Sequence, residues 1–336
     1  MTRAVLVGLG LLVAGCNDAK HHISCPGDPA CPINADIDAG TTDDGGAVGV
    51  GQCSSLHITG QTVTPSIELL LDRSASMVDK LGNVTRYAAM ADAVTGTAGF
   101  VTLFQSQLAI GATVFSDDQL CPTVASAPRA LNNAAAIAAL IAAHAPAGST
   151  PTDVTISAMV ADFEASPPAA GHPPIIALIT DGGSTQCGTP KDTSPQAIVA
   201  AQDAYAKGVR LGVIALAPTA QTADFFQALA NAGAGVQAGQ PNAPYYPIAA
   251  GAQIVDALKH ITGSVQPCDL TLDAPIPAAS GPTGTVTLNG TALTYSTDWS
   301  LDADGVTLHV LGAACTTLKT SVTPTLDAMF ACAAHT

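Results

Sequence analysis

The stretch IELLLDRSAS, residues 67–76, decides the fold of this chain. A short and nearly continuous apolar run is typical of a strand that helices cover on both faces of a parallel sheet. Polar residues follow at once, beginning with Asp72. The stretch therefore predicts a buried strand that ends in a polar turn.

Further runs of this kind lie at residues 108–115, 174–181 and 211–216. Helical patterns lie between and after them, at residues 86–104, 130–144, 152–164, 194–208, 222–232 and 253–262. Strands that alternate with helices predict a doubly wound α/β domain with a mostly parallel sheet, over about residues 55–265.

Shifts in composition divide the chain into four regions. Residues 1–16 have the pattern of a signal segment, and the acidic, Gly- and Asp-rich residues 17–52 predict a disordered tether. Residues 53–267 hold the α/β pattern. In residues 268–336, a hairpin signal at Asn289-Gly290 and a further strand at residues 306–311 predict a small β-rich module linked by disulfides.

The charge of the chain excludes two classes of partner. The 336 residues carry a formal net charge of −15, with only 11 Lys and Arg against 26 Asp and Glu. Such a chain has no basic surface for a phosphate backbone, so we expect no nucleic-acid binding. It also lacks the charge for attraction to anionic lipid headgroups.

The amino terminus predicts export. An apolar run, residues 4–15, follows the positive start Met1-Thr2-Arg3 and ends in Leu-Val-Ala-Gly-Cys at Cys16. This sequence resembles a bacterial lipobox, which implies lipidation of Cys16 and a membrane anchor. An ordinary signal peptide that contains a Cys is the alternative.

The cysteine count agrees with export. Setting Cys16 aside leaves eight of the nine Cys, an even number that in an exported chain indicates disulfides. The sequence contains no Cys-x-x-Cys pair, so a zinc ribbon and a thioredoxin motif are both unsupported. Proximity in the expected fold favours the pairs Cys25–Cys31, Cys53–Cys268, Cys121–Cys187 and Cys315–Cys332, although eight Cys permit about 105 pairings.

Three polar segments fall where ligands bind in open α/β sheets, beyond the carboxyl ends of the strands. The first holds Asp72, Ser74 and Ser76; the second, Gly-Ser-Thr-Pro-Thr at residues 148–152, holds Thr150; and the third, Thr-Asp-Gly-Gly at residues 180–183, holds Asp181. Two carboxylates and three hydroxyls are oxygen ligands, which suit a hard divalent cation.

Together these segments resemble the metal-ion-dependent adhesion site of von Willebrand factor A (VWA) domains, in the order that the family has, over about residues 63–265. The resemblance implies a cation, Mg²⁺ first with Mn²⁺ or Ca²⁺ as alternatives, held by Asp72, Ser74, Ser76, Thr150 and Asp181. It also implies a protein ligand whose Asp or Glu completes the coordination. The whole layout is similar to VWA envelope lipoproteins of soil bacteria such as myxobacteria.

We therefore expect an envelope-anchored binding protein rather than an enzyme, at the outer membrane or cell surface rather than the inner membrane. Its partner and its oligomeric state stay open. One alternative is a structural lipoprotein whose metal only stabilises the fold. The other is a serine hydrolase with Ser74 or Ser76 as nucleophile and His172 or His144 as base, although no Gly-x-Ser-x-Gly turn is present.

Overall fold

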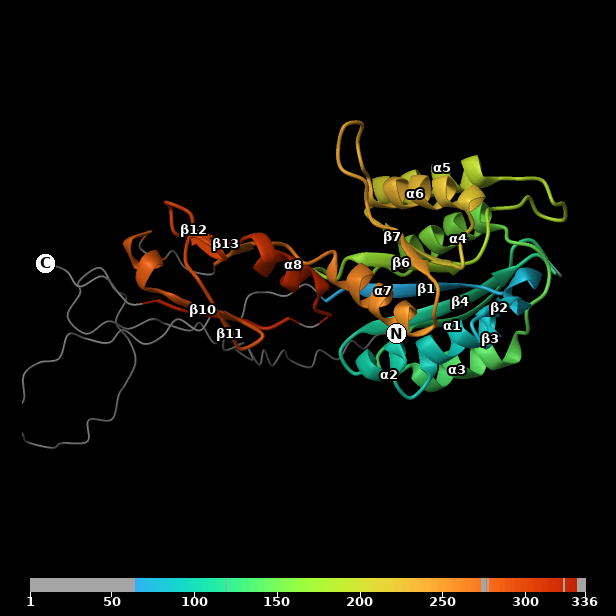
Figure 1. Cartoon of the computed structure of the whole chain (residues 1–336), viewed down its shortest axis with the longest axis horizontal. Coiled ribbons are helices and arrows are strands. Elements are labelled where there is room, and N and C mark those ends of the chain that lie inside the picture. Colours follow the sequence, from blue (N-terminus) through green and yellow to red (C-terminus); the bar gives the residue numbers. More distant parts are fainter. Residues whose placement is uncertain (1–63, 119, 273–275, 277, 323, 331–336) are drawn as a thin grey trace, which may run out of the picture.

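The computed structural model describes residues 64–118, 120–272, 276, 278–322 and 324–330 (Figure 1). Its main feature is a six-stranded sheet in the order β5-β4-β1-β6-β7-β8. The strands are β1 (Ser66–Asp72), β4 (Ala109–Ser116), β5 (Thr123–Ala130), β6 (Pro174–Thr180), β7 (Arg210–Leu216) and β8 (Tyr246–Ile248). All neighbours pair in parallel except β4 and β5, which are antiparallel. The predicted doubly wound, mostly parallel α/β fold is confirmed.

Helices cover both faces of this sheet, which explains the continuous apolar strands. All seven residues of β1 are buried. Leu69 and Leu71 belong to one apolar cluster and Leu70 to another, because successive side chains point to opposite faces. The helices are α1 (Arg86–Thr95), α2 (Phe100–Phe104), α3 (Ala134–Ala143), α4 (Thr152–Ala165), α5 (Ser194–Ala206), α6 (Ala220–Ala234) and α7 (Ala252–Gly263).

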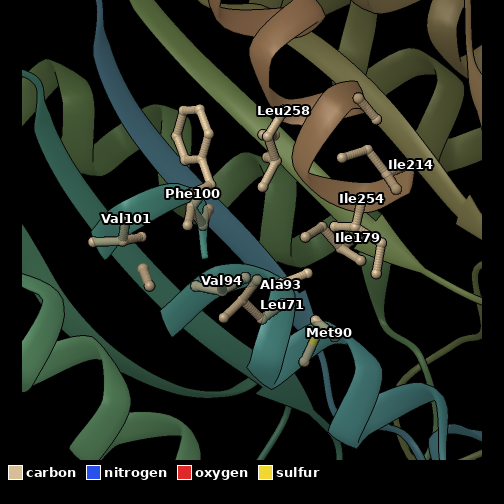
Figure 2. Close-up of a cluster of buried hydrophobic side chains, with 14 of the residues drawn as sticks. Leu71, Met90, Ala93, Val94, Phe100, Val101, Ile179, Ile214, Ile254 and Leu258 are labelled. Carbon is tan, nitrogen blue, oxygen red and sulfur yellow. The ribbon is translucent and has the colours of Figure 1, made fainter. Parts of the chain in front are cut away.

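Each face has its own core. Helices α1, α2, α3 and α7 pack on one face, where Figure 2 shows Phe100 and Leu258 over the sheet beside Ile214. Helices α4, α5 and α6 pack on the other, around Phe115 and Phe226. Burying two apolar faces at about 25 cal/mol per Å² is the main stabilising contribution in such a layered domain.

Two of the predicted helices were too long. The helix expected over residues 86–104 is split into α1 and α2. The backbone becomes extended at Gly96, which ends α1, and it packs tightly against the preceding turn at Gly99, just before α2. A Cβ at Gly99 would lie 2.8 Å from the backbone nitrogen of Gly96. The helix expected over residues 130–144 begins only at Ala134, because residues 123–130 form the edge strand β5.

Short elements complete this part of the chain. A 3-10 turn, η1 (Ala75–Val78), follows β1 and leads into a small hairpin of β2 (Lys80–Leu81) and β3 (Val84–Thr85). Strand β3 of this hairpin ends at Thr85, and α1 begins at the next residue, Arg86.

The C-terminal part forms two small sheets and one helix around a separate core that includes the fully buried Trp299. Sheet β11-β10-β14 holds β10 (Thr285–Leu288), β11 (Thr291–Leu293) and β14 (Leu326–Met329), and sheet β12-β13-β9 holds β9 (Asp269–Thr271), β12 (Trp299–Leu301) and β13 (Thr307–Val310). A 3-10 turn, η2 (Ala278–Thr283), and helix α8 (Gly312–Thr320) lie between strands.

The predicted hairpin is confirmed, because β10 and β11 pair across Asn289 and Gly290, whose φ values are 50° and 76°. The other predicted strand forms as β13, which pairs with β9 and β12. Helix α8 was not predicted.

The disulfides confirm one expected pair and correct two. Cys121 and Cys187 are joined as expected. Cys268 is joined to Cys315, so the expected Cys53–Cys268 and Cys315–Cys332 pairs were wrong. The reason is α8, which brings the Cα atom of Cys315 within 5.6 Å of that of Cys268 at the start of β9.

Residues 1–16 with Cys16, the tether, and Cys25, Cys31, Cys53 and Cys332 lie outside the described residues. In the ranges that the structure describes, no helix has the length and apolar character needed to cross a membrane.

Candidate metal centre

The candidate site lies where β1 and β6 end side by side. These central strands run in parallel with Leu71 opposite Ile179, so Asp72 and Thr180 emerge at the same edge of the sheet. Asp181 follows directly. The sequence reaches this geometry because two apolar strands of similar length stop at a polar residue in the same register.

Asp72 is held rigidly by its neighbours. Its side chain is fully buried. The backbone nitrogen of Ser74 donates to Oδ1 at 2.7 Å, and Thr180 Oγ1 donates to Oδ2 at 2.6 Å. These bonds fix the carboxylate without adding a cationic partner to it.

The two serines connect the first segment to the third. Ser74 Oγ and Ser76 Oγ lie 3.1 Å apart, and Ser76 Oγ donates to Asp181 Oδ1 at 2.8 Å. The first and third segments are therefore joined by a continuous chain of oxygen atoms.

The loop that carries Thr150 lies against both of the other segments. The backbone nitrogen of Ala75 donates to the Gly148 carbonyl at 2.9 Å. On the far side, the nitrogen of Thr150 donates to Thr185 Oγ1 at 3.0 Å, and that of Thr185 donates to the Thr150 carbonyl at 2.9 Å. The Thr150 loop is thus bonded to the first segment at Ala75 and to Thr185, two residues beyond the third segment.

Gly148 makes this approach possible. Its φ of +73° is a left-handed conformation that side chains disfavour, and a Cβ there would lie 2.7 Å from Asp117 Oδ1. Asp117 also accepts bonds from the backbone nitrogens of Ser149 and Gly188, so it ties together three loops at the rim.

The electrostatics of the site favour a cation. Burial raises the pKa of Asp72 to about 6, with a further increase from the charge of Asp181, against the lowering effect of its bonds from Thr180 and Ser74. Two buried carboxylates at one place are costly unless positive charge is supplied; Arg86, 2.7 Å from Asp181, supplies one positive charge, and a divalent cation would supply two. The donor set consists of oxygen atoms, which is the set that Mg²⁺, Mn²⁺ and Ca²⁺ prefer.

The residues present therefore fit a hard divalent cation. Among the described residues no three His, Cys, Asp or Glu side chains form a metal-binding group. Any cation here would thus depend on the hydroxyls of Ser74, Ser76 and Thr150 as well as on the two carboxylates.

Sequence reasoning missed the two arginines of the site. Arg73, inside the motif, is 4% exposed and forms an ion pair with Asp118 as well as a 3.2 Å bond to the Ala145 carbonyl. Arg86 Nη1 lies 2.7 Å from Asp181 Oδ2. No sequence signal marks Arg86, which stands at the start of a predicted helix.

The histidines weighed for a hydrolase lie with other groups. His144 Nδ1 bonds the Leu140 carbonyl at 2.8 Å. His172 lines a cavity of about 530 Å³ around Glu68 and Arg129, at the opposite end of β1 from Asp72. The hydroxyls of Ser74 and Ser76 bond to each other, and Ser76 Oγ also bonds to Asp181, within the candidate metal centre.

Comparisons with solved structures find similar folds at low identity. The chain is similar to an aerotolerance-related membrane protein of Bacteroides fragilis, with 15% identity, a TM-score of 0.44, and coverage of 59% of this chain and 98% of that one. It is similar to manganese-loaded TRAP of Plasmodium vivax, with 16% identity, a TM-score of 0.42, and coverage of 61% of this chain and 74% of that one. It is also similar to the VWA domain of SpRpn10, with 14% identity, a TM-score of 0.41, and coverage of 59% of this chain and 95% of that one. No protein-family model and no curated protein matches the sequence.

Proposed function

We propose that this chain carries a VWA-type domain that binds a protein ligand through a divalent cation. The observation that carries the proposal is the hydrogen-bonded set from Asp72 through Ser74 and the exposed Ser76 to Asp181, at the carboxyl edge of a parallel sheet. Two buried carboxylates with neighbouring hydroxyl oxygens, one of them open to solvent at Ser76, form a suitable site for a hard cation.

Each residue would have a distinct part. Asp72 and Asp181 would supply the two negative charges that balance a divalent ion, and Ser74, Ser76 and Thr150 would supply neutral oxygens. The bonds from Ser74 N and Thr180 Oγ1 would keep Asp72 in place as the ion enters. The bound ion would supply a coordination position for an Asp or Glu of the partner.

Isothermal titration of the full chain with Mg²⁺ and with Mn²⁺ tests the cation site. We expect Asp72→Ala to abolish binding, because it removes a fully buried charged ligand. Asp203→Ala is the matched control, since Asp203 is exposed on the outer helix α5. Equal affinity of Asp72→Ala and the wild type would refute the site.

A pull-down from envelope extracts tests the ligand. The native chain should retain a protein that is released by chelator, and Asp72→Ala should not retain it. Chelation that lowers the melting temperature while no cation-dependent partner is retained would support a purely structural role instead.

We also propose that the chain is a bacterial envelope lipoprotein anchored through Cys16, at the outer membrane or cell surface. The lipobox-like end of residues 1–16 supports this. Labelling of expressing cells with a radioactive fatty acid should mark the wild type but not Cys16→Ser. Label on both proteins, or on neither, would contradict it.

A further inference from the structure

We propose that Arg86 competes with the cation for Asp181: it pairs with Asp181 in the absence of the ion, and when a divalent ion binds it gives up Asp181 and pairs with Asp79 alone. This inference rests on the proposed function, because it concerns the same site. It makes Arg86 the residue that sets the affinity of the site.

The contact between Arg86 and Asp181 is strong for an ion pair. Arg86 Nη1 lies 2.7 Å from Asp181 Oδ2, and the side chain of Asp181 has no exposed surface. The other oxygen of Asp181 accepts from Ser76 Oγ. A short, charge-assisted bond away from water is stronger than one at the surface. A cation ligated by Asp181 therefore competes with an existing partner.

The backbone of Arg86 is fixed, so the exchange concerns its side chain. Its backbone nitrogen donates to the Asp79 carbonyl at 2.8 Å, and Arg86 begins α1, whose first turn is capped by Thr85 Oγ1 accepting from the nitrogen of Ala88. The hairpin of β2 and β3 closes the loop between Asp79 and Arg86.

A second carboxylate lies within reach of the same nitrogen. Arg86 Nη1 is 3.3 Å from Asp79 Oδ2 and 3.4 Å from the Ser76 carbonyl. The side chain of Asp79 is 63% exposed, so it can adjust to meet the guanidinium. A small rotation of Arg86 would keep its charge paired after Asp181 is released.

The rest of the guanidinium binds little that would resist this rotation. Arg86 Nε is buried and has no hydrogen-bond partner in the part of the chain that the structure describes. Leaving Asp181 would therefore cost Arg86 one strong bond. The existing ion pair with Asp79 can shorten from 3.3 Å and offset that loss.

Charge gives the direction of the effect. Asp72 and Asp181 together present two negative charges, and Arg86 cancels one of them. A divalent cation that enters beside Arg86 meets both a weaker field and a like charge. Removing Arg86 should strengthen cation binding, and removing Asp79 should weaken it, because Arg86 then loses its second partner.

Titration of the full chain with Mn²⁺ tests this exchange in four proteins, namely the wild type, Arg86→Gln, Asp79→Asn and the double variant. We expect Arg86→Gln to bind Mn²⁺ about tenfold more tightly or better, and Asp79→Asn to bind several-fold more weakly. In the Arg86→Gln background, Asp79→Asn should have almost no effect, because the exchange no longer exists.

The double variant separates exchange from simple attraction of Mn²⁺ to the charge of Asp79. Equal weakening by Asp79→Asn with and without Arg86 would overturn the exchange. The matched control is Arg210→Gln, which removes an exposed arginine that contacts the Tyr205 ring. It should leave the affinity unchanged.

Failure of the inference is distinguishable from failure of the proposed function. If the wild type binds Mn²⁺ and Arg86→Gln binds it no more tightly, the competition is refuted and the cation site stands. If neither protein binds Mn²⁺, the cation site itself is refuted. Circular dichroism melting checks that Arg86→Gln is folded, and the exposed Asp79→Asn provides a test if it is not.

Discussion

Glu68 is a carboxylate in the middle of β1 that lies apart from the candidate metal centre. It is 3% exposed, Thr113 Oγ1 donates to its Oε1 at 2.7 Å, and Arg129 Nη1 lies 3.5 Å from its Oε2. A Cβ on Gly111 would lie 2.7 Å from Arg129 Cγ, so a glycine is needed beside this pair. Burial raises the pKa of Glu68 to about 7, against the lowering effect of Thr113 and Arg129.

This raised pKa predicts a pH-dependent loss of stability. A carboxyl whose folded pKa lies above its unfolded value of 4.5 stabilises the fold at low pH and loses that contribution as the pH rises through about 7. The free energy of unfolding of Glu68→Gln should therefore rise by about 1–3 kcal/mol relative to that of the wild type between pH 5 and pH 8, at about 1.4 kcal/mol per pKa unit.

Urea unfolding at the two pH values, with chelator present throughout, measures this difference. Glu164→Gln is the control, because Glu164 is 53% exposed and pairs with Lys207 at the surface. A Glu68→Gln stability that follows the wild type across the whole range would contradict the prediction.

Some residues of the candidate site were predictable from the sequence, and the contacts of others were not. Asp72, Ser74 and Ser76 were found because they occupy alternate positions directly after an apolar run, and their role as ligands stays a prediction. Arg86 and Thr180 reach Asp181 and Asp72 only through side-chain directions that tertiary packing decides. No spacing in the sequence encodes those directions.

The Cys121–Cys187 disulfide joins two loops at the rim of the site. Cys121 lies in the loop between β4 and β5, and Cys187 in the loop after β6. Asp117 links the same loops to the one that carries Thr150, by accepting from the nitrogens of Gly188 and Ser149. The disulfide should therefore stabilise both the fold and the position of Thr150.

Replacing both cysteines tests this coupling. Cys121→Ser with Cys187→Ser should lower the free energy of unfolding by about 2–4 kcal/mol and weaken Mn²⁺ binding, since the open loops regain conformational entropy. Replacing Cys268 and Cys315 is the matched control, and it should lower stability without changing the affinity. Equal effects of both pairs on the affinity would count against a role at the rim.

His309 on β13 lies between two carboxylates, one of them on the neighbouring strand β9. Its Nδ1 lies 2.7 Å from Asp269 Oδ1 and its Nε2 lies 2.9 Å from Asp302 Oδ1. Hydrogen bonding to Asp269, then to Asp302, raises the pKa of His309 above its ordinary value of 6.5. Protonation of His309 therefore stabilises the folded C-terminal part relative to the unfolded chain.

The stability that His309 provides should be complete below the unfolded pKa and disappear as the pH rises through the raised folded value. Thermal melts of the wild type and His309→Gln should differ at pH 5.5 and converge at pH 9, because neutral imidazole loses the charge-assisted bonds. A difference that is constant with pH would show that packing alone is responsible.

Among elements, the long apolar strands and the amphipathic helices were predictable because burial on both faces leaves a continuous pattern. Strand β5 was missed, since it is an edge strand with a single buried residue, Ala127. Helix α8 was missed for a related reason, because it has only two buried residues, Ala314 and Leu318.

In the whole molecule, the two parts meet where α7 packs against α8. Gly263, the last residue of α7, faces the backbone of Lys319 so closely that a Cβ would lie 2.7 Å from its carbonyl carbon and 3.1 Å from the Ser321 oxygen. Figure 1 shows the C-terminal part continuing from this end of the sheet domain. The sequence predicted two regions but not this contact between them.

Gly263→Ala should separate the two helices and destabilise the chain by about 1–3 kcal/mol, the usual cost of overpacking. Hydrogen–deuterium exchange should speed up in residues 312–320 but not in β1 or β6. Gly251→Ala, at the other end of α7, is the control, because its nearest atom would be 3.3 Å away. Unchanged exchange in α8 would show that the contact contributes little.

The oxygen atoms of the metal centre are far apart in the chain. Ser76 and Asp181 are separated by 105 residues, and Asp72 and Thr180 by 108. Closing loops of this length is slow and depends on prior pairing of the central strands. We therefore expect the candidate site to form only after β6 has paired with β1, because Asp181 follows β6 directly. An ion that binds only the folded chain would stabilise it by RT ln(1 + [ion]/Kd), so the unfolding equilibrium would depend on the ion concentration.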